Sequence, residues 1–326
     1  MRRFRESLSL RVAFLALCVS APIRGADVVA TLLEHLGPDD EYLLVWVVSS
    51  SREQKLWLED LADNPMWSAT AGSHPTTTLH AEKNRSFLIQ FAIESTPVCL
   101  VLDSSGREAG RLRIGELTKD AVRSLPGRLS DLLIAAEASR RYENGSDVRD
   151  GDPSTLFWLG SFHWNRGERY KALRWFEEYT ALPCGQNGAD PELKARALYR
   201  LGEHALETGQ IPRAEEHFAR ALDLSRAPER RARCALALAR SLRRLGHAER
   251  AIQSIESQLR SQPASPLRDR LLFTLGYLHL DLGHREKARE VFTECMTSYP
   301  TSAYSRKSAH YLSELGVSAE ERTEGG

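Results

Sequence analysis

The side chains in this sequence best suited to covalent or redox chemistry are its cysteines. No two of them are separated by two residues, so the sequence has neither a disulfide-exchanging Cys-x-x-Cys pair nor a zinc knuckle. Disulfides can form in an oxidising compartment, but this spacing specifies no pairing. We expect buried single thiols, no metal and no cofactor. The five cysteines are Cys18, Cys99, Cys184, Cys234 and Cys295.

A serine nucleophile is the next chemistry to consider, because Ser49, Ser50 and Ser51 are consecutive. A serine needs a positioned base, and the sequence has no Gly-x-Ser-x-Gly turn. His74 and His80 follow in a stretch that we interpret as irregular. The metalloprotease, phosphate-binding and dinucleotide-binding motifs are also missing from the sequence. We therefore interpret the serines as a loop and helix cap, and we expect no enzyme activity.

The elements that would position such side chains form a mixed α/β pattern in the first part of the chain. Tyr42–Val48 (YLLVWVV) is a continuous apolar run, which is typical of a strand buried on both faces. After it we predict a helix, two strands separated by a turn, and a final helix with a break or kink at Pro126-Gly127. These elements span Gln54–Ala62, Val98–Leu102, Glu108–Ile114 and Leu117–Ala138.

Two segments, Ser95–Asp103 (STPVCLVLD) and Gly106–Leu112 (GREAGRL), resemble the C-terminal half of a thioredoxin-like domain. The resemblance implies an α/β thioredoxin-like fold for residues 26–140, with a cis proline at Pro97 beside the active site. In that family a Trp-Cys-x-x-Cys motif begins a helix, where the helix dipole and the first amides stabilise a thiolate. The corresponding slot here is Ser50–Gln54 (SSREQ), which contains no sulfur.

Ser51 and Gln54 mark this degenerate active-site slot. Thiol–disulfide exchange needs an attacking thiolate and a second thiol, so the first domain cannot carry out the usual reaction of its relatives. We expect it to offer a docking face around Pro97, where relatives hold extended substrates. The alternative is a redox or peroxide-related protein that uses Cys99 or the thiols of a partner, although Cys99 lies in an apolar strand that favours a buried thiol.

Beyond a linker rich in glycine and aspartate, the pattern becomes helical and repeats. Gly167, Gly209, Gly246 and Gly283 recur at intervals of 42, 37 and 37 residues. With the leucine, alanine and phenylalanine positions around them, they resemble tetratricopeptide repeats (TPRs), helix pairs that stack into a solenoid. The resemblance implies an all-α C-terminal domain. Its linker, four repeats, capping helix and disordered tail span residues 141–152, 153–301, 302–316 and 317–326.

TPR solenoids resemble one another in binding partner peptides on the inner face of the first helix of each repeat. Guanidinium groups bind carboxylates through paired hydrogen bonds, and aromatic rings add flat apolar contact. We expect an acidic or C-terminal peptide of a protein partner to bind here. The alternative is that the arginines pair with acids such as Glu203 and Glu207 or are solvated. The motif positions that carry the expectation are Arg196, Tyr199, Arg233, Arg240, Arg243, Arg270, Phe273 and Tyr277.

The first 25 residues are typical of a secretory signal. A basic segment precedes the apolar run Val12–Ala21, which is too short to span a bilayer as a helix. A lipoprotein modified at Cys18 is an alternative, but Leu17 stands where a small residue is required. An uncleaved amphipathic N-terminus is another. We expect a periplasmic or secreted protein of the bacterial envelope, with no membrane span after signal cleavage.

The formal net charge is zero, from 44 basic and 44 acidic residues, but it is unevenly distributed. Residues 1–25 carry +4, residues 26–140 carry −6 and residues 141–326 carry +2. Removal of the signal leaves about −4, which argues against a nucleic-acid partner. The sequence therefore predicts a non-catalytic scaffold of the bacterial envelope that binds a protein partner. An envelope assembly chaperone is a further alternative.

Overall fold

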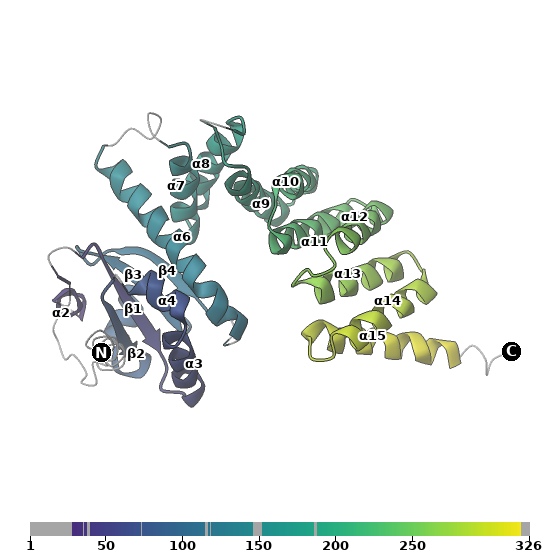
Figure 1. Ribbon diagram of the computed structural model, residues 1–326, viewed down its shortest axis with the longest axis horizontal. Coiled ribbons are helices and arrows are strands. Elements are labelled where there is room, and N and C mark those ends of the chain that lie inside the picture. The colour runs from purple at the N-terminus through teal and green to yellow at the C-terminus, as the bar shows by residue number, and fades with distance from the viewer. Residues whose placement is uncertain are drawn as a thin grey trace, which may run out of the picture. The chain divides into compact units, whose positions relative to one another are not determined.

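The three-dimensional structure is a computed structural model. It describes residues 28–320 except 35, 38–39, 73, 115–116, 118, 146–151 and 186–187. The predicted signal, residues 146–151 of the predicted linker and residues 321–326 of the predicted tail lie outside the described residues. Contacts divide the chain into two compact units (Figure 1). The first falls within residues 1–151 and 158–172, and the second within residues 152–157 and 173–326.

The first unit contains a four-stranded sheet, in the order β2-β1-β3-β4. Strand β1 pairs in parallel with β2 and antiparallel with β3, and β3 pairs antiparallel with β4. All seven residues of β1 are buried, as predicted for an apolar strand covered on both faces. The four strands span Tyr42–Val48, Thr76–His80, Val98–Asp103 and Glu108–Arg113.

Helices cover both faces of the sheet. Helices α2, α3, α4, α5 and α6 span Val28–Leu33, Arg52–Ala62, Pro65–Ala71, Arg85–Gln90 and Lys119–Glu143, and a short 3-10 helix, η1, spans Ala81–Lys83. Because successive strand residues point to opposite faces, Trp46 packs with α3, α4 and α6, whereas Val45 packs with α2 and α5. The Trp46 ring lies 5.7 Å from the rings of both Trp57 and Trp67. These indoles form the centre of one core layer.

Strand β2 was not predicted. The stretch that contains His74 and His80 is not wholly irregular, because Thr76–His80 (TTTLH) forms this strand and His80 ends it. Its threonines have the β-branched shape that suits a strand. Their hydroxyl groups remove the apolar pattern by which strands are recognised in a sequence.

Helix α6 also differs from its prediction, because it continues past Pro126 to Glu143 instead of ending at Ala138. Proline provides no N–H for the carbonyl four residues earlier, which belongs to Val122. The Asn64 side chain donates to that carbonyl from Nδ2 at 3.5 Å. A side chain from the α3–α4 turn thus supplies the donor that the proline lacks.

Four helix pairs and a final helix follow, in agreement with the repeat pattern. The pairs α7/α8, α9/α10, α11/α12 and α13/α14 span Ser154–Asn165/Arg169–Ala181, Pro191–Glu207/Ile211–Leu224, Pro228–Arg244/Ala248–Ser261 and Arg268–Asp281/Arg285–Ser298. The final helix, α15, spans Ala303–Glu320, four residues beyond the predicted end of the capping helix. Within the described ranges, no helix combines the length and apolar character needed to cross a bilayer.

The glycine period that identified the repeats comes from the turn inside each pair. Gly167, Gly209, Gly246 and Gly283 all have φ between +74° and +79°, a left-handed conformation that glycine adopts without steric cost. A Cβ at any of them would meet no atom within 4 Å. These glycines are therefore required by backbone conformation and not by lack of space.

At the Leu-Gly positions, by contrast, glycine is required because there is no space for a side chain. A Cβ on Gly202 would lie 2.7 Å from the Phe218 ring, and one on Gly276 would lie 2.6 Å from the Phe292 ring. In the third repeat the corresponding pair is Ala239 and Ile255, both buried. Glycine on the first helix thus faces the large phenylalanine on the second, and alanine faces the smaller isoleucine. The matched volumes keep each helix pair closely packed.

Candidate functional site

The second unit has a groove in the predicted binding face. It is a cavity of about 350 Å³ between α9, α11, α13 and α15. Seven of the eight predicted residues line it, namely Tyr199, Arg233, Arg240, Arg243, Arg270, Phe273 and Tyr277. The eighth, Arg196, does not; its guanidinium lies over the Phe157 ring at 4.9 Å. Regular helix spacing on stacked repeats is sufficient to bring the seven together.

The four arginines of the groove differ in their ion pairs. Arg233 pairs with Glu229 at 2.6 Å, and Arg243 pairs with Asp281 at 3.2 Å. Within the described part of the chain, no carboxylate pairs with Arg240 or Arg270. The acids named from the sequence, Glu203 and Glu207, pair with none of the four in that part; Glu203 instead binds Arg200 at 2.7 Å. The groove therefore has an excess of positive charge.

The aromatic residues of the groove form an ordered surface. Phe273 lies 5.9 Å from Phe292, 5.6 Å from Tyr304 and 5.9 Å from Tyr311, measured between ring centroids. Tyr311 also stacks on Phe292 at 5.4 Å and contacts Tyr277 edge-on at 5.9 Å. Offset and edge contacts of this kind favour fixed ring positions. A ligand therefore meets rings that are already held in place.

Tyr311 is a groove residue that the sequence analysis missed. It belongs to α15, whereas the repeat pattern gives inward positions only for the first helix of each repeat. Arg243 lies over the Tyr277 ring at 5.3 Å and Arg270 over the Tyr304 ring at 5.9 Å. Such contacts hold guanidinium groups against aromatic faces without neutralising their charge.

The degenerate slot of the first unit is a tied structural corner. Ser51 caps α3, as predicted, and its Oγ accepts from the Gln54 backbone N–H at 3.3 Å. The buried Gln54 side chain donates from Nε2 to the Thr96 carbonyl at 3.1 Å and to Thr96 Oγ1 at 3.2 Å, and its Oε1 accepts from Ser49 N–H at 2.7 Å. The Thr96-Pro97 peptide is cis. The structure thus brings Ser51 and Gln54 to the Thr96-Pro97 turn.

A further contact fixes the serine loop and leaves it without a base. Ser50 donates from its N–H and its Oγ to the Glu82 carboxylate, at 2.8 and 3.1 Å. The hydrogen bond from the Ser50 backbone holds the pKa of Glu82 below its usual range. An ionised, weakly basic carboxylate of this kind is poorly suited to activate a serine.

Three of the four described cysteines are buried, as expected, and these offer little for redox chemistry; Cys184 is exposed, which corrects the expectation for that thiol. Cys99 is completely buried in β3, and burial raises the pKa of its thiol. Burial also raises the pKa of Cys234, to about 11. A thiol must ionise to attack a disulfide. Among the described residues all four cysteines are free thiols, and no group of three or more His, Cys, Asp or Glu side chains could hold a metal ion.

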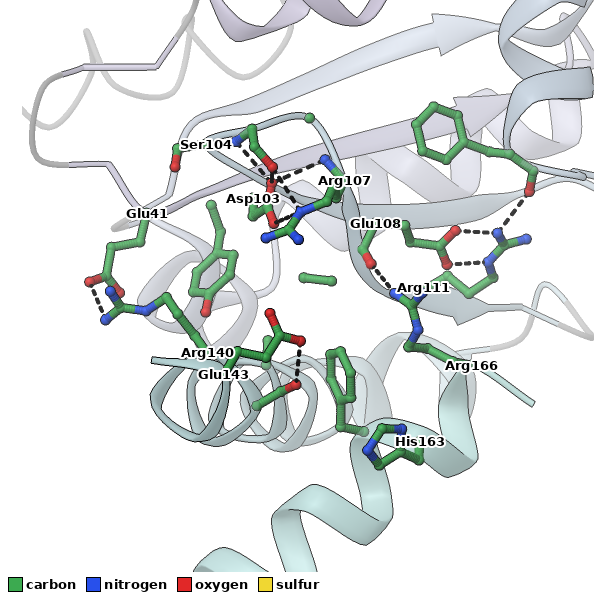
Figure 2. A pocket seen from close by; sticks show the side chains of 18 of the residues that line it. Glu41, Asp103, Ser104, Arg107, Glu108, Arg111, Arg140, Glu143, His163 and Arg166 are labelled. Atoms are coloured by element: carbon green, nitrogen blue, oxygen red, sulfur yellow. Dashed lines mark hydrogen bonds and ion pairs between the residues drawn. The ribbon is translucent and has the colours of Figure 1, made fainter. Parts of the chain in front are cut away.

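The first unit has a larger cavity, of about 1260 Å³, beside the β3–β4 hairpin, α6 and the α7–α8 turn (Figure 2). Its charged groups are largely paired with one another. Asp103 binds Arg107 at 3.2 Å, and Glu41 binds Arg140 at 3.0 Å. Glu108 binds Arg111 within β4. Because its charges are compensated internally, this cavity has less to offer a charged ligand than the groove has.

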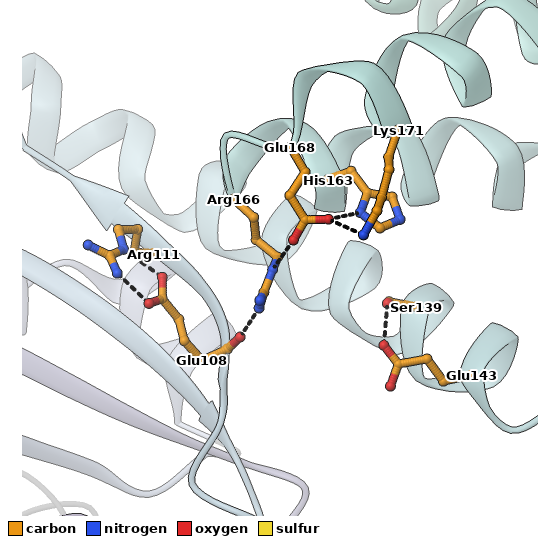
Figure 3. A network of polar contacts seen from close by, with 8 residues as sticks. All are labelled: Glu108, Arg111, Ser139, Glu143, His163, Arg166, Glu168 and Lys171. Atoms are coloured by element: carbon orange, nitrogen blue, oxygen red, sulfur yellow. Dashed lines mark hydrogen bonds and ion pairs between the residues drawn. The ribbon is translucent and has the colours of Figure 1, made fainter. Parts of the chain in front are cut away.

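A polar network at the edge of this cavity links β4 to the α7–α8 turn within the first unit (Figure 3). The Glu168 carboxylate contacts Lys171 Nζ at 2.9 Å, Arg166 Nε at 3.0 Å and His163 Nδ1 at 2.9 Å. Hydrogen bonds from Lys171 and then the other two lower the pKa of Glu168 to about 2. Arg166 also donates to the Glu108 carbonyl. Glu168 therefore orders this turn.

Comparisons with known proteins agree with the repeat pattern. A family model described as tetratrico peptide repeat matches residues 196–315, which run from α9 into α15. The crystal structure of the apo form of RapI is similar over 83% of this chain and 71% of its own, with a TM-score of 0.50 and 14% identity.

A thermophilic TPR protein of Thermus thermophilus is 18% identical, over 60% of this chain and 95% of its own, with a TM-score of 0.36. No curated protein matches the chain. The C-terminal region is built of TPRs, a type of repeat that generally serves as a protein-binding scaffold.

Proposed function

We propose that this protein is a non-catalytic scaffold whose TPR groove binds a segment of a partner protein. The observation that carries the proposal is the groove itself. Aromatic rings held in place by one another lie beside arginines whose charge is only partly compensated. Aromatic residues and arginine are the side chains that contribute most at protein interfaces. Stacked repeats provide an extended surface of this kind.

A catalytic role has less support from the same residues. Ser51 acts as a helix cap, Glu82 is held by Ser50, and Cys99 is buried with a raised thiol pKa. An insulin-reduction assay tests the redox alternative. We expect no turnover; turnover that Cys99→Ser abolishes would show that the protein is an enzyme.

Site-specific photocrosslinking tests the groove. A photoreactive residue replaces Thr274, which lines the groove, or Glu290, which is exposed on α14 and serves as the matched control. In the native host we expect a discrete adduct from position 274 that disappears when Tyr277→Ala is added, and no such adduct from position 290. The same adducts from both positions, or none from position 274, would contradict groove binding.

We also propose that the N-terminal unit, residues 26–140, is a thioredoxin-like domain without redox activity. The sheet order β2-β1-β3-β4, with β1 and β2 parallel and the other neighbours antiparallel, supports this assignment. The contact between Gln54 and Thr96 supports it too, because it joins the degenerate slot to the turn at Pro97. This domain is proposed to dock a partner, and the whole protein to act in the bacterial envelope after export.

A further inference from the structure

We propose that the groove selects an acidic segment, in which two carboxylates about three residues apart flank an aliphatic or aromatic side chain. This inference rests on the proposed function, because it names the partner class of the same groove. It assigns Arg240 as the principal residue that determines charge specificity.

The positive charges of the groove lie at two levels along its helices. Arg233 stands in the first half of α11 and Arg270 near the beginning of α13, whereas Arg240 and Arg243 stand about two and nearly three turns beyond Arg233 on α11. Seven residues of α-helix, from Arg233 to Arg240, rise roughly 10 Å. An extended peptide covers that distance in about three residues.

The space between the two levels is apolar. Leu236 and Ala237 of α11 and Phe273 of α13 line the groove there. Phe273 is fixed by its contacts with Tyr304 and Tyr311. A ligand side chain between the two carboxylates therefore meets a flat apolar surface, which favours an aliphatic or aromatic residue.

Arg240 is the most available of the arginines. It is exposed and, within the described ranges, has no ion pair, whereas Arg243 is held by Asp281 and Tyr277. Among the described residues Arg233 pairs with Glu229, and both members of that pair are more than half exposed. Exposed pairs of this kind contribute little, so a ligand carboxylate can replace Glu229. Arg270, at the same level as Arg233, also has no ion pair among the described residues and lies over the Tyr304 ring. We therefore expect Arg240 to bind one ligand carboxylate, and Arg233 or Arg270 to bind the other.

A peptide fits these observations better than a nucleic acid. A backbone of closely spaced phosphates needs a continuous basic track. Here an apolar stretch separates two small groups of arginines, and residues 141–326 carry only +2.

Panning a random decapeptide display library on the full-length protein tests the inference. We expect the recovered peptides to be enriched in pairs of Asp or Glu three residues apart with an apolar residue between them. The best synthetic peptide should bind about tenfold or more weakly when its acids become Asn or Gln, since charge-assisted hydrogen bonds are lost. Fluorescence anisotropy measures this change.

Variants of the protein complete the experiment. Arg240→Glu and Arg240→Gln should weaken binding of the acidic peptide about tenfold or more. Arg260→Glu is the matched control, because Arg260 is exposed on α12 outside the groove, and it should leave binding unchanged. Circular dichroism verifies that each variant is folded.

The possible failures are distinguishable. If the recovered peptides are not enriched in Asp and Glu, or bind equally well when these acids become Asn and Gln, the charge specificity is overturned and groove binding is left intact. The same holds if a fluorescent oligothymidine binds more tightly and displaces the peptide in an Arg240-dependent way. Peptides whose binding is unaffected by both Tyr277→Ala and Arg240→Glu, or no binding peptides at all, would overturn the proposed function together with the inference.

Discussion

Gln54 shows how one side chain can tie the start of a helix to backbone that is distant in the sequence. It is the third residue of α3, after the Ser51 cap. Its amide oxygen accepts from the Ser49 backbone N–H, and its amide nitrogen donates to Thr96. An amide neither ionises near neutral pH nor attacks a disulfide. Gln54 therefore orders this corner without supplying a nucleophile.

Restoring two thiols at this corner tests whether it has thioredoxin-like geometry. Ser51→Cys/Gln54→Cys places two cysteines three residues apart at the start of α3, which is the spacing of a Cys-x-x-Cys motif. We expect a reversible disulfide and a gain of insulin-reducing activity, because the helix start favours a thiolate. Thiol titration before and after reduction measures the bond.

Ser51→Cys alone is the control and should give a free thiol without turnover. The double variant also loses the hydrogen bonds of Gln54, which we expect to cost about 1–3 kcal/mol of stability. Two thiols that stay reduced in a folded, oxidised sample would contradict the proposed likeness.

Glu168 gives a prediction about pH. The folded state holds its pKa at about 2, below its ordinary value of 4.5, so the unfolded chain binds the proton first as the pH falls. Its contribution is complete above pH 4.5 and is lost between pH 4.5 and about 2. The shift would be worth about 3 kcal/mol if fully realised, but Lys171 and Arg166 are more than a third exposed, so we expect about 1 kcal/mol.

Urea unfolding of the wild type and of Glu168→Gln at several pH values measures this difference. The wild type should be more stable at pH 7, and the gap should close towards pH 3. His163 affects stability at a higher pH than Glu168 does. Burial lowers the pKa of His163, so the folded state loses stability relative to the unfolded chain as the pH falls below 6.5. A gap between the two proteins that is independent of pH would contradict the role given to Glu168.

Single residues were predictable where their role is local. Ser51 was recognisable as a cap because a serine directly precedes a helix, and one hydrogen bond three residues away fulfils that role. The partners of Gln54 and Ser50 lie 42 and 32 residues away in the sequence. No local pattern specifies such contacts, because they arise only when the sheet forms.

At the scale of elements, the helix pairs depend on matched volumes. Gly276→Ala places a Cβ against the Phe292 ring, and we expect overpacking of about 1–3 kcal/mol, partly offset by about 1 kcal/mol of better helix propensity. Adding Phe292→Ile reproduces the small-and-large pair of the third repeat. The double variant should therefore be more stable than the sum of the two single changes predicts.

Thermal and urea unfolding measure this cycle. Gly316→Ala is the control, since a Cβ added at that helical glycine would meet no atom within 4 Å, and it should gain up to about 1 kcal/mol. Strict additivity of Gly276→Ala and Phe292→Ile would show that the two residues do not share this packing constraint.

Elements were predictable in proportion to the regularity of their pattern. The glycine period identified the helix pairs because the turn inside each pair needs the same left-handed backbone conformation. Strand β1 was recognisable from its apolar run. Strand β2 was missed because its threonines are polar. The helix through Pro126 was predicted, but the hydrogen bond from Asn64 to the Val122 carbonyl joins residues 58 apart in the sequence and was not.

At the scale of the whole molecule, most of the predicted groove residues could be named from the sequence, whereas the identity of the partner could not. Seven of its residues followed from helix spacing, while Tyr311 belongs to the final helix.

The first 25 residues give a second prediction at this scale, because a basic segment followed by an apolar run favours export.

A reporter fusion tests export. Residues 1–30 joined to a mature β-lactamase should confer ampicillin resistance on a Gram-negative host, because that enzyme protects the cell only outside the cytoplasm. Replacing the apolar run with charged residues, for example Leu15→Arg/Leu17→Arg, should abolish resistance by breaking the apolar segment. Resistance that is unchanged by this substitution, or no resistance at all, would contradict export through this segment.

The three indoles packed together on one face of the sheet, from β1, α3 and α4, have a spectroscopic consequence. The chain has six tryptophans, and none lies beyond Trp175. Indole fluorescence therefore follows the N-terminal core and the first repeat, whereas far-ultraviolet circular dichroism is dominated by the helices of the solenoid. Recording both signals in one denaturation therefore shows whether the N-terminal core and the first repeat unfold together with the other helices of the solenoid.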